Sequence, residues 1–289
     1  MHLYPPSVEV AHAASHEAAL IPHGGSVVGC HHGPVPVHHV ADSGFDREAE
    51  VYEQARPSYP PDCIAWFAEH LGIAPDRDVL DLAAGTGKFT RLLEPLGAHL
   101  TASEPVDGMR AVLHRTSPAI PIVSSAAEFM PFRATSFDAI TVAQAFHWFD
   151  APVALAEAAR VLRAHGRLGL VWNARDRSAE HVDALWSIMD RVEKNAPWRK
   201  HEEWRDAAFT ETSFFGPLHG ATFQHEQLLT VDDVVGRFQS VSHVAVLDDA
   251  PKQAVLTEVR DLLAEHPATA GKEYIPIPYR VDAYWCEKA

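Results

Sequence analysis

The segment that most constrains this chain is an apolar run followed by a glycine turn and then by a helical pattern. Val79-Leu80-Asp81-Leu82 has the composition of a buried strand, Gly85-Thr86-Gly87 supplies a tight turn, and helical spacing begins behind it. In open α/β sheets this arrangement turns backbone N–H groups and a helix N-terminus toward the crevice at the carboxyl end of the strand. The segment therefore predicts a site for a polar, nucleotide-like ligand.

Short apolar runs alternate with amphipathic stretches from Pro61 onward, as expected of a βαβ protein. Pro61 opens a predicted helix that Gly72 is placed to end, and Asp150 is the predicted N-cap of a later helix closed by Gly166. The later helix is expected to bury Val153, Leu155, Ala159 and Leu162. The predicted strands are Val79–Leu82, His99–Ser103, Ile120–Val123, Ala139–Ala143 and Leu168–Trp172.

The alternation loosens after Asn173. A helix through Leu185 and Met189 is followed by a predicted strand at Ala221–Leu229, and Tyr274–Trp285 is the predicted last strand. Two helical patterns lie between these strands, and we expect them to form a small cap at about residues 230–270. The sequence thus predicts an α/β fold of the Rossmann-like, doubly wound kind, with a mostly parallel seven-stranded sheet and a helical cap inserted before the last strand.

The first 44 residues differ from the rest, since they hold eight of the 19 histidines among Pro and Gly without sustained periodicity. We interpret residues 1–44 as a disordered arm and residues 45–289 as the folded domain. Histidine-rich tracts can bind Zn or Ni. However, no histidine pair lies on a convincing helix and almost no carboxylate is nearby, so no metal site is predicted.

The charge balance narrows the classes of partner. Lys and Arg number 24 and Asp and Glu 39, so the net charge is −15, and without a basic stripe such a surface repels phosphate backbones. No window approaches about 18 consecutive apolar residues, and no basic segment precedes an apolar stretch near residue 1. We therefore expect no nucleic acid, no membrane span and a cytoplasmic location. Cys30, Cys63 and Cys286 are too far apart to suggest a disulfide framework or a zinc knuckle.

Two kinds of nucleotide site remain open at the glycine turn. A dinucleotide fingerprint would need a third glycine where Thr90 stands, and Asp81 would place a negative charge near a pyrophosphate. Seventeen residues after Gly87, Glu104 ends the second predicted strand, where a carboxylate can accept hydrogen bonds from ribose hydroxyls. This pattern favours an adenosine-bearing ligand with a cationic end and no phosphate.

In these motifs the chain resembles the class I S-adenosylmethionine-dependent methyltransferases, over roughly Phe45–Ala289. The resemblance implies that Asp81–Gly87 approaches the methionine part of the cofactor, that Glu104 binds the ribose, and that Ala127-Glu128-Phe129-Met130-Pro131-Phe132 borders the adenine. The demethylated product would be S-adenosylhomocysteine. The implied cofactor site comprises Arg56, Tyr59, Asp81, Ala83, Gly85, Gly87, Glu104, Pro105, Met109, Ala127, Glu128 and Gln144.

A finer resemblance is to the small-molecule branch that includes trans-aconitate methyltransferases. The run from Phe137 to Phe149 is similar to that branch's fourth strand and following loop, and Ala55–Pro60 is similar to its N-terminal element. In that branch an Arg and a Tyr close over the carboxylate end of the cofactor, a role that falls here on Arg56 and Tyr59. A helical insertion helps to form its substrate pocket, and residues 238–242 stand in the corresponding place.

The expected reaction is in-line transfer of a sulfonium methyl group, which needs alignment, exclusion of water and sometimes a base, but no metal. His147 is the candidate base, and the alternative is that it belongs to an aromatic wall with Trp148 and Phe149. The expected acceptor is a small organic molecule, with an oxygen favoured by family analogy. A non-catalytic cofactor-binding module and an NAD-dependent dehydrogenase are the alternatives. Six aromatic residues of the C-terminal half could either line an apolar pocket for the acceptor or pack in the hydrophobic core. They are Trp186, Trp198, Trp204, Phe209, Phe214 and Phe215.

Overall fold

A computed structural model describes residues 49, 53, 56–192, 207–241, 244 and 247–289 of the chain. The predicted N-terminal arm, residues 1–44, lies outside this range. Trp198 and Trp204 lie outside it as well.

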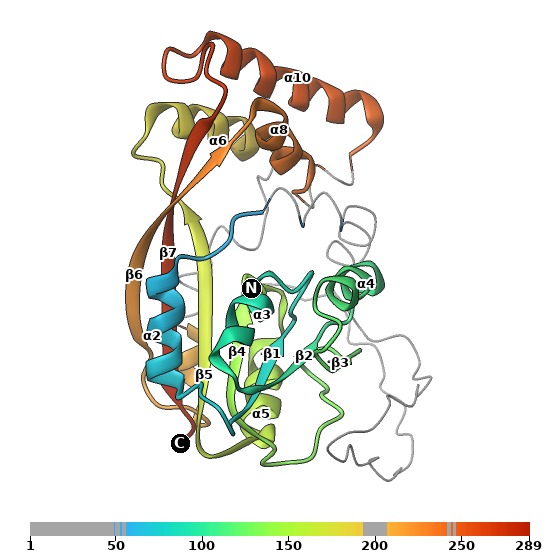
Figure 1. Ribbon diagram of the computed structural model, residues 1–289, viewed down its shortest axis with the longest axis vertical. Helices are drawn as coiled ribbons and strands as arrows, with labels where there is room; N and C mark the ends of the chain where they lie inside the picture. Colours follow the sequence, from blue (N-terminus) through green and yellow to red (C-terminus); the bar gives the residue numbers. More distant parts are fainter. Residues whose placement is uncertain (1–48, 50–52, 54–55, 193–206, 242–243, 245–246) are drawn as a thin grey trace, which may run out of the picture.

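In the described residues, seven strands form one sheet in the order β3-β2-β1-β4-β5-β7-β6 (Figure 1). The first five strands are parallel, and β7 runs antiparallel to both of its neighbours. The chain moves outward from β1 to β2 on one side and continues with β4 on the other, so the sheet has its switch point between β1 and β4. The strands are β1 (Asp78–Leu82), β2 (His99–Ser103), β3 (Ile122–Val123), β4 (Phe137–Ala143), β5 (Leu162–Arg175), β6 (His219–Leu229) and β7 (Ile275–Glu287).

Helices cover both faces of the sheet. On one face α2 (Pro61–Leu71) and α3 (Lys88–Leu93) pack on the strands, and on the other α5 (Ala151–Val161) does. Helix α2 begins with Pro61 in its first turn and ends at Gly72, which is left-handed with φ 66°, as its sequence predicts. Helix α4 (Asp107–Thr116) follows β2, and short 3₁₀ turns occupy Glu94–Leu96 and Phe146–Trp148. The predicted doubly wound fold is confirmed.

The cap lies at the end of the sheet where β5, β6 and β7 extend beyond the other strands (Figure 1). Helices α8 (Val231–Gln239) and α10 (Asp249–Glu265) come from the predicted insertion before β7. Helix α6 (Glu180–Val192), which lies between β5 and β6 in the chain, joins them in one hydrophobic cluster. The cap therefore draws on a segment outside the predicted range. No helix in the described ranges is long and apolar enough to cross a bilayer.

Some predicted boundaries were wrong. Helix α5 ends at Val161, and both Leu162 and Gly166 lie in β5, which is much longer than predicted. Leu155 and Ala159 are buried as predicted, but Val153 is 46% exposed, and Ala154 lies on the inner face of α5 in its place. Asp150 stands at the N-cap position, yet its side chain makes no capping hydrogen bond.

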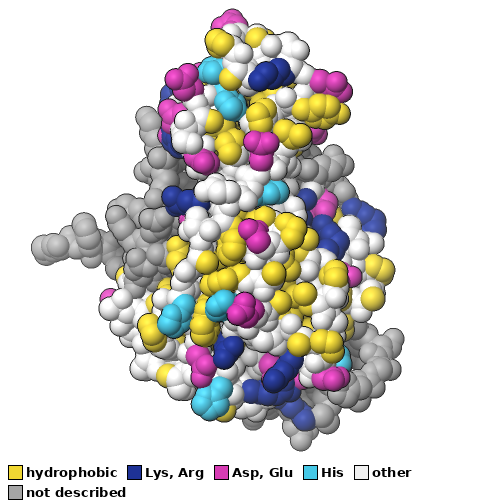
Figure 2. Space-filling model, turned by 60° about the vertical axis from the view of Figure 1, so that its left-hand side comes forward, with side chains coloured by type: hydrophobic (Ala, Val, Ile, Leu, Met, Phe, Trp, Pro, Cys, Tyr) yellow, Lys and Arg dark blue, Asp and Glu magenta, His cyan; other side chains and the backbone are white. Residues whose placement is uncertain are grey.

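Aromatic and imidazole rings close the outer side of the sheet against α2. Ring centroids are 4.6 Å apart for Trp66 and His70, 4.8 Å for His219 and Trp285, and 5.7 Å for His70 and Trp285. Figure 2 shows hydrophobic side chains gathered on this side of the body, with histidines among them. Trp66, His70 and Trp285 are half-buried and His219 is exposed, and the contact of His70 with Trp285 joins α2 to the antiparallel end of the sheet.

The close approach of α2 to β5 depends on Gly169. A Cβ at Gly169 would lie 2.7 Å from both Phe67 Cε1 and Leu71 Cδ1, so Gly169→Ala should lower the free energy of unfolding by about 1–3 kcal/mol through overpacking. Gly236, inside α8, is the control: a Cβ there meets nothing within 4 Å, and Gly236→Ala should stabilise by about 1 kcal/mol. Urea unfolding followed by circular dichroism measures both. A Gly169→Ala protein as stable as the wild type would contradict this packing.

Candidate functional site

The carboxylate of Asp81 is fully buried at the end of β1 and joins three elements. Thr90 Oγ1 on α3 donates to Oδ2 at 2.5 Å, and Thr141 Oγ1 on β4 donates to Oδ1 at 2.9 Å. Burial raises the pKa of Asp81 to about 6, and the two hydroxyl hydrogen bonds oppose that rise. Sequence analysis treated Thr90 only as the missing third glycine. In the structure it fixes the carboxylate.

The turn after β1 is left-handed at three positions. The φ angles are 54° at Ala83, 60° at Gly85 and 84° at Gly87. A Cβ at Gly87 would lie 2.3 Å from Leu113 Cδ1, whereas a Cβ at Gly85 would meet nothing within 4 Å. The turn therefore packs against α4 at Gly87 and leaves room beside its own backbone at Gly85, as the close approach of a ligand to the backbone requires.

The loop that follows β4 also contains a strained backbone conformation. Gln144, directly after β4, has a φ of 59°, and its N–H donates to Val171 O of β5 at 2.9 Å. Ala83 and Gln144 are both non-glycine residues in the left-handed region, which costs about 1–2 kcal/mol each. Strained residues at the ends of β1 and β4, on either side of the switch point, support a functional site there.

Glu104 at the end of β2 holds the glycine turn. Its Oε2 accepts the N–H of Gly85 at 2.8 Å, and its Oε1 accepts the N–H of Val106 at 2.9 Å. Burial raises the pKa of Glu104 to about 7, against the effect of these two hydrogen bonds. Each carboxylate oxygen keeps a further lone pair. Glu104 can therefore hold the turn and still accept hydrogen bonds from a ligand hydroxyl.

The predicted adenine-side residues divide into two groups. Pro105 follows Glu104, and Met109 packs with Val106 on the inner side of α4. Ala127 is buried in the core of the body, and Glu128 Oε1 accepts the N–H of Asp150 at 2.8 Å, which holds the start of α5. The Glu128 side chain thus has a structural partner in addition to any contact with a ligand.

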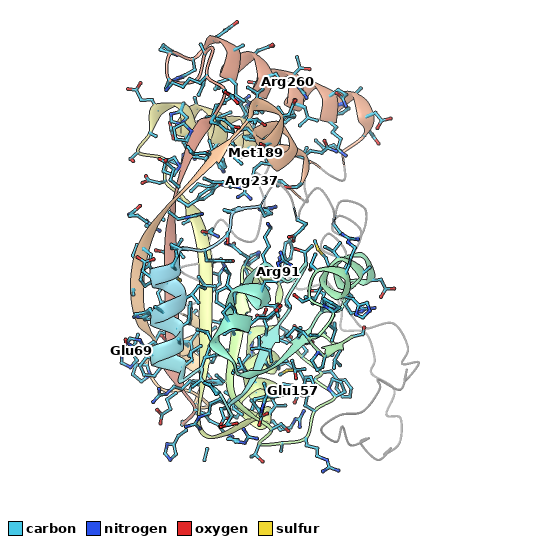
Figure 3. The ribbon with its side chains drawn as sticks, viewed as in Figure 1. Glu69, Arg91, Glu157, Met189, Arg237 and Arg260 are labelled. Carbon is cyan, nitrogen blue, oxygen red and sulfur yellow. The ribbon has the colours of Figure 1, made fainter. Side chains whose placement is uncertain are left out.

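The loop that carries Ala127 and Glu128 is clamped from α5. Glu157 Oε1 accepts the N–H of Met130 at 2.9 Å, and Arg160 donates to the carbonyls of Met130 at 2.9 Å and Phe132 at 2.8 Å. Figure 3 shows Glu157 on the lower part of the body, away from the cap. Sequence analysis missed this pair, because nothing in a helical Glu-x-x-Arg spacing indicates which loop it faces.

Arg91 is a second positioning residue that sequence analysis missed. Its Nη1 donates to Thr86 O in the turn at 2.9 Å and to Thr116 Oγ1 at 2.8 Å, and its Nη2 pairs with Glu53. Arg91 stands four residues after Gly87, so one helical turn returns its side chain toward the glycine turn (Figure 3). That spacing is a signal that could have identified it.

The N-terminal segment of the body reaches the cap. Arg56 Nη2 donates to Ser240 O at the end of α8 at 3.3 Å, and Asn173 Nδ2 donates to Ser58 O at 3.2 Å. The ring of Tyr59 packs edge-on against Phe89, with centroids 5.1 Å apart. Arg56 therefore lies between body and cap, whereas the ring of Tyr59 belongs to the core beside α3.

His147 lies in the short turn Phe146–Trp148 after β4. Trp172 Nε1–H donates to His147 Nδ1 at 3.3 Å. An indole N–H only donates, so the neutral imidazole carries its proton on Nε2 and presents a donor there. The surrounding rings support the aromatic wall, since His147 and Trp148 have centroids 5.0 Å apart and Phe146 packs on Phe149 at 5.7 Å.

The remaining predicted aromatic residues divide between core and surface. Trp186 is buried in the cap core and Phe215 in the body core, while Phe209 packs on Phe146 and Phe214 is exposed. These four do not gather around one apolar pocket. The core interpretation therefore holds for Trp186 and Phe215.

The site residues fit an adenosine-bearing cofactor. Asp81, Ala83, Gly85, Gly87 and Glu104 come together at the carboxyl ends of β1 and β2, and Gln144 and His147 follow the adjacent β4. Among the described residues, the hydroxyl of Thr86 is buried in the turn without a hydrogen-bond partner, as a ligand-facing hydroxyl would be. No group of three or more metal-binding side chains occurs in the described part of the chain.

Comparison with known proteins gives the family. A family model described as a methyltransferase domain matches residues 80–170. An uncharacterized methyltransferase of Mycobacterium tuberculosis is 36% identical over 240 residues, which cover 81% of this chain and 91% of the relative. An uncharacterized methyltransferase-like protein of Schizosaccharomyces pombe is 31% identical over 245 residues, covering 84% of this chain and 95% of that protein.

A solved structure agrees. A protein of Anaeromyxobacter dehalogenans that is assigned as a type II methyltransferase superposes with a TM-score of 0.57 and 25% identity, covering 81% of this chain and 96% of that one. The chain belongs to the class I S-adenosylmethionine-dependent methyltransferases. The chain is therefore not an NAD-dependent dehydrogenase, in agreement with Thr90 at the position where the dinucleotide fingerprint needs a third glycine.

The buried charge of Asp81 has a consequence for stability. Burial raises its pKa from an ordinary 3.8 to about 6, so the folded chain holds this proton more tightly than the unfolded chain, and ionisation lowers stability as pH rises from about 4 to about 7. Asp81→Asn should match the wild type near pH 4 and exceed it at pH 7.5 by up to about 3 kcal/mol.

Urea unfolding at several pH values measures the difference between the two proteins. The control is Asp261→Asn on the exposed side of α10, which should show no such pH-dependent difference. A stabilisation by Asp81→Asn that shrinks as pH rises would contradict the assigned direction of the shift.

Proposed function

We propose that the protein transfers the methyl group of S-adenosylmethionine to an oxygen of a small organic acceptor. The geometry of Glu104 is the observation that supports the cofactor in this proposal. Each of its carboxylate oxygens accepts one backbone N–H and keeps one lone pair that can accept a hydrogen bond from a ribose hydroxyl. The oxygen acceptor and the likeness to trans-aconitate methyltransferases rest on the motifs at Ala55–Pro60 and Phe137–Phe149.

The binding roles follow from the positions of the residues. The turn at Ala83, Gly85 and Gly87 lets the cofactor approach its backbone, and Glu104 accepts from the ribose hydroxyls. The N–H groups of Gly85 and Gly87 themselves donate to Glu104 Oε2 and Ala84 O. In this proposal Pro105, Met109, Ala127 and Glu128 border the adenine, and Arg56 and Gln144 bind the methionine end. The ring of Tyr59 packs in the core against Phe89, so a contact of Tyr59 with the cofactor stays a prediction. When bound, S-adenosylmethionine supplies a methyl group already activated by its sulfonium charge. The buried carboxylate of Asp81 gives this end of the crevice the negative charge that a cationic ligand needs.

His147 is proposed to orient the acceptor. Because Nδ1 accepts from Trp172, the N–H at Nε2 can donate to an acceptor oxygen, and a carboxylate oxygen needs no base to become nucleophilic. The adjacent aromatic side chains exclude water from the transfer. Removal of a proton by His147 is the competing mechanism.

The wider setting is also a proposal. A net charge of −15 supports a small-molecule acceptor and not a nucleic acid, and the composition supports a cytoplasmic location. Residues 45–289 would form the methyltransferase domain, with residues 1–44 as an arm outside it. A protein that binds the cofactor but methylates nothing in a broad metabolite screen would be a binding module instead.

Glu104→Gln tests the cofactor site. The amide keeps the shape but turns one acceptor oxygen into a donor, so it can no longer accept from both backbone N–H groups and a ribose. The dissociation constant for S-adenosylhomocysteine, measured by calorimetry at pH 8, should rise about 10–100-fold, which is about 1–3 kcal/mol. The matched control is Glu69→Gln on the exposed side of α2, far from the crevice in Figure 3, which should bind as the wild type does.

The same titration has a pH signature. Burial raises the pKa of Glu104 to about 7, and the ionised form is the better hydrogen-bond acceptor, so wild-type affinity should increase several-fold from pH 6 to pH 8. Glu104→Gln should lose this dependence. An unchanged affinity in the variant, or no binding by the wild type, would overturn the assignment.

His147→Ala distinguishes orientation from proton removal. If His147 orients the acceptor, the substitution should raise the KM for the acceptor about tenfold, and the single-turnover rate should stay flat through pH 6–8, around the ordinary histidine pKa of about 6.5. Cofactor affinity should be unchanged. A loss of single-turnover rate of about 10²–10⁴-fold, with a wild-type rate that rises with pH, would instead establish His147 as the base.

A further inference from the structure

Two buried donors in the cap lack hydrogen-bond partners. Tyr279 on β7 is completely buried and Trp186 on α6 is 2% exposed. Among the described residues, neither the Tyr279 hydroxyl nor the Trp186 indole N–H has a hydrogen-bond partner. An unpaired buried polar group costs about 1–3 kcal/mol, and nearly all such groups in folded proteins find a partner in the protein, in water or in a ligand. The polar group of a ligand is one partner that these donors can take.

Two arginines join these donors into one group, which we call the neck cluster: Arg175, Trp186, Arg237 and Tyr279. The guanidinium of Arg237 on α8 lies over the Tyr279 ring, 5.5 Å from its centroid, and that of Arg175 lies 5.1 Å from the centre of the Trp186 ring. Arg175 is paired in register with Tyr279 across β5 and β7. The neck cluster thus stands where the long strands enter the cap.

The neck cluster lies beyond the carboxyl ends of β4 and β5, on the acceptor side of the crevice. Gln144 after β4 is bonded to Val171 of β5, and Arg175 is four residues further along that strand. Burial lowers the pKa of Lys88, which lies beside the glycine turn. The negative charge of Glu53 raises that pKa, and the positive charges of Arg91 and Arg237 lower it further. In Figure 3 Arg237 lies at the edge of the cap that faces the body.

Arg237 places a buried positive charge beside Tyr279, although the whole chain is acidic. The cations nearer the glycine turn, Lys88 and Arg91, are paired with Glu53, which lies 3.8 Å from Lys88, and the buried carboxylates of Asp81 and Glu104 lie at the same turn. The chain as a whole has a net charge of −15. A buried guanidinium beside a buried neutral donor is an environment that binds a carboxylate.

We propose that Arg237 and the hydroxyl of Tyr279 bind a carboxylate of the methyl acceptor, so that the acceptor is a small organic acid. This inference rests on the proposed methyl transfer. The bound carboxylate is an anchor, and a second nucleophilic group of the same molecule receives the methyl group. The two residues thereby determine which acceptors reach the cofactor, and they take no part in the transfer itself.

The test compares acids with their neutral amides. Benzoate, phenylacetate and glutarate, with benzamide, phenylacetamide and glutaramide, are titrated by ligand-observed NMR against protein saturated with S-adenosylhomocysteine. Each acid should bind at least about tenfold more tightly than its amide, because the amide carries no charge for Arg237. Acids that bind no more tightly than amides would overturn the inference.

Variants assign the binding to the cluster. Tyr279→Phe keeps the ring and its stacking, and should weaken binding of the acids about 5–20-fold without lowering the melting temperature, since it removes an unpaired hydroxyl. Arg237→Met should reduce the acids to the affinity of the amides. Arg260→Met, on exposed α10 at the far side of the cap in Figure 3, is the matched control and should bind as the wild type does.

The outcomes separate this inference from the proposed function. If S-adenosylhomocysteine fails to bind the wild type, the proposed function fails, and the comparison of acids with amides on the free protein still tests the neck cluster. If it binds and Tyr279→Phe leaves the affinity for acids unchanged, the inference is wrong. Tyr279→Phe also decides the matter if Arg237→Met does not fold. Equal losses in Arg260→Met would likewise contradict a specific anchor.

Discussion

The carboxylate of Asp81 is the constraint on which the rest of the site depends. It is removed from water at the end of β1, and each of its oxygens is held by one threonine hydroxyl, from α3 and from β4. A buried carboxylate is costly unless it is hydrogen-bonded in this way. The two hydroxyls therefore determine where α3 begins and how β4 lies beside β1. The glycine turn occupies the short connection between these fixed points.

The second buried carboxylate acts on the same turn from the other side. Glu104 holds the N–H of Gly85, while Arg91 holds the carbonyl of Thr86. The negative charge of Asp81 also raises the pKa of Glu104, although burial is the larger cause. Without a ligand, the crevice thus contains two carboxylates whose ionisation is unfavourable. A cationic cofactor relieves that cost, so stability of the free protein and affinity for the cofactor depend on the same groups.

The sequence predicted most of the fold because buried parallel strands are short apolar runs that stand out from their surroundings. It failed at the end of α5, where Leu162 continues the apolar spacing of the helix but belongs to β5. The predicted range of the cap, about residues 230–270, did not include α6 for a similar reason. Helix α6 is amphipathic, and its pattern of apolar residues does not indicate which part of the protein buries its apolar face.

Part of the candidate site could be predicted from the sequence, and part could not. The positions of Asp81, Gly85 and Glu104 beside one another were predictable, because all three stand at the ends of neighbouring strands, while their roles toward a cofactor stay predictions. Contacts between distant segments were not predictable, since spacing along the chain carries no information about them. The bond from Trp172 to His147, which fixes the ring proton, and the stacking of Arg237 on Tyr279 are of this second kind.

The cap has a hydrophobic core of its own, separate from the clusters on the two faces of the body sheet. Substitutions at sites without shared contacts have nearly additive effects on stability. Mutations in the cap core can therefore accumulate with little penalty to the crevice that holds the cofactor. Under the proposed role of the neck cluster, acceptor preference can then diverge between descendants of one ancestral gene while the residues at the ends of β1 and β2 are inherited unaltered. The long strands β5, β6 and β7 make this separation possible, since they carry both cores on one continuous frame.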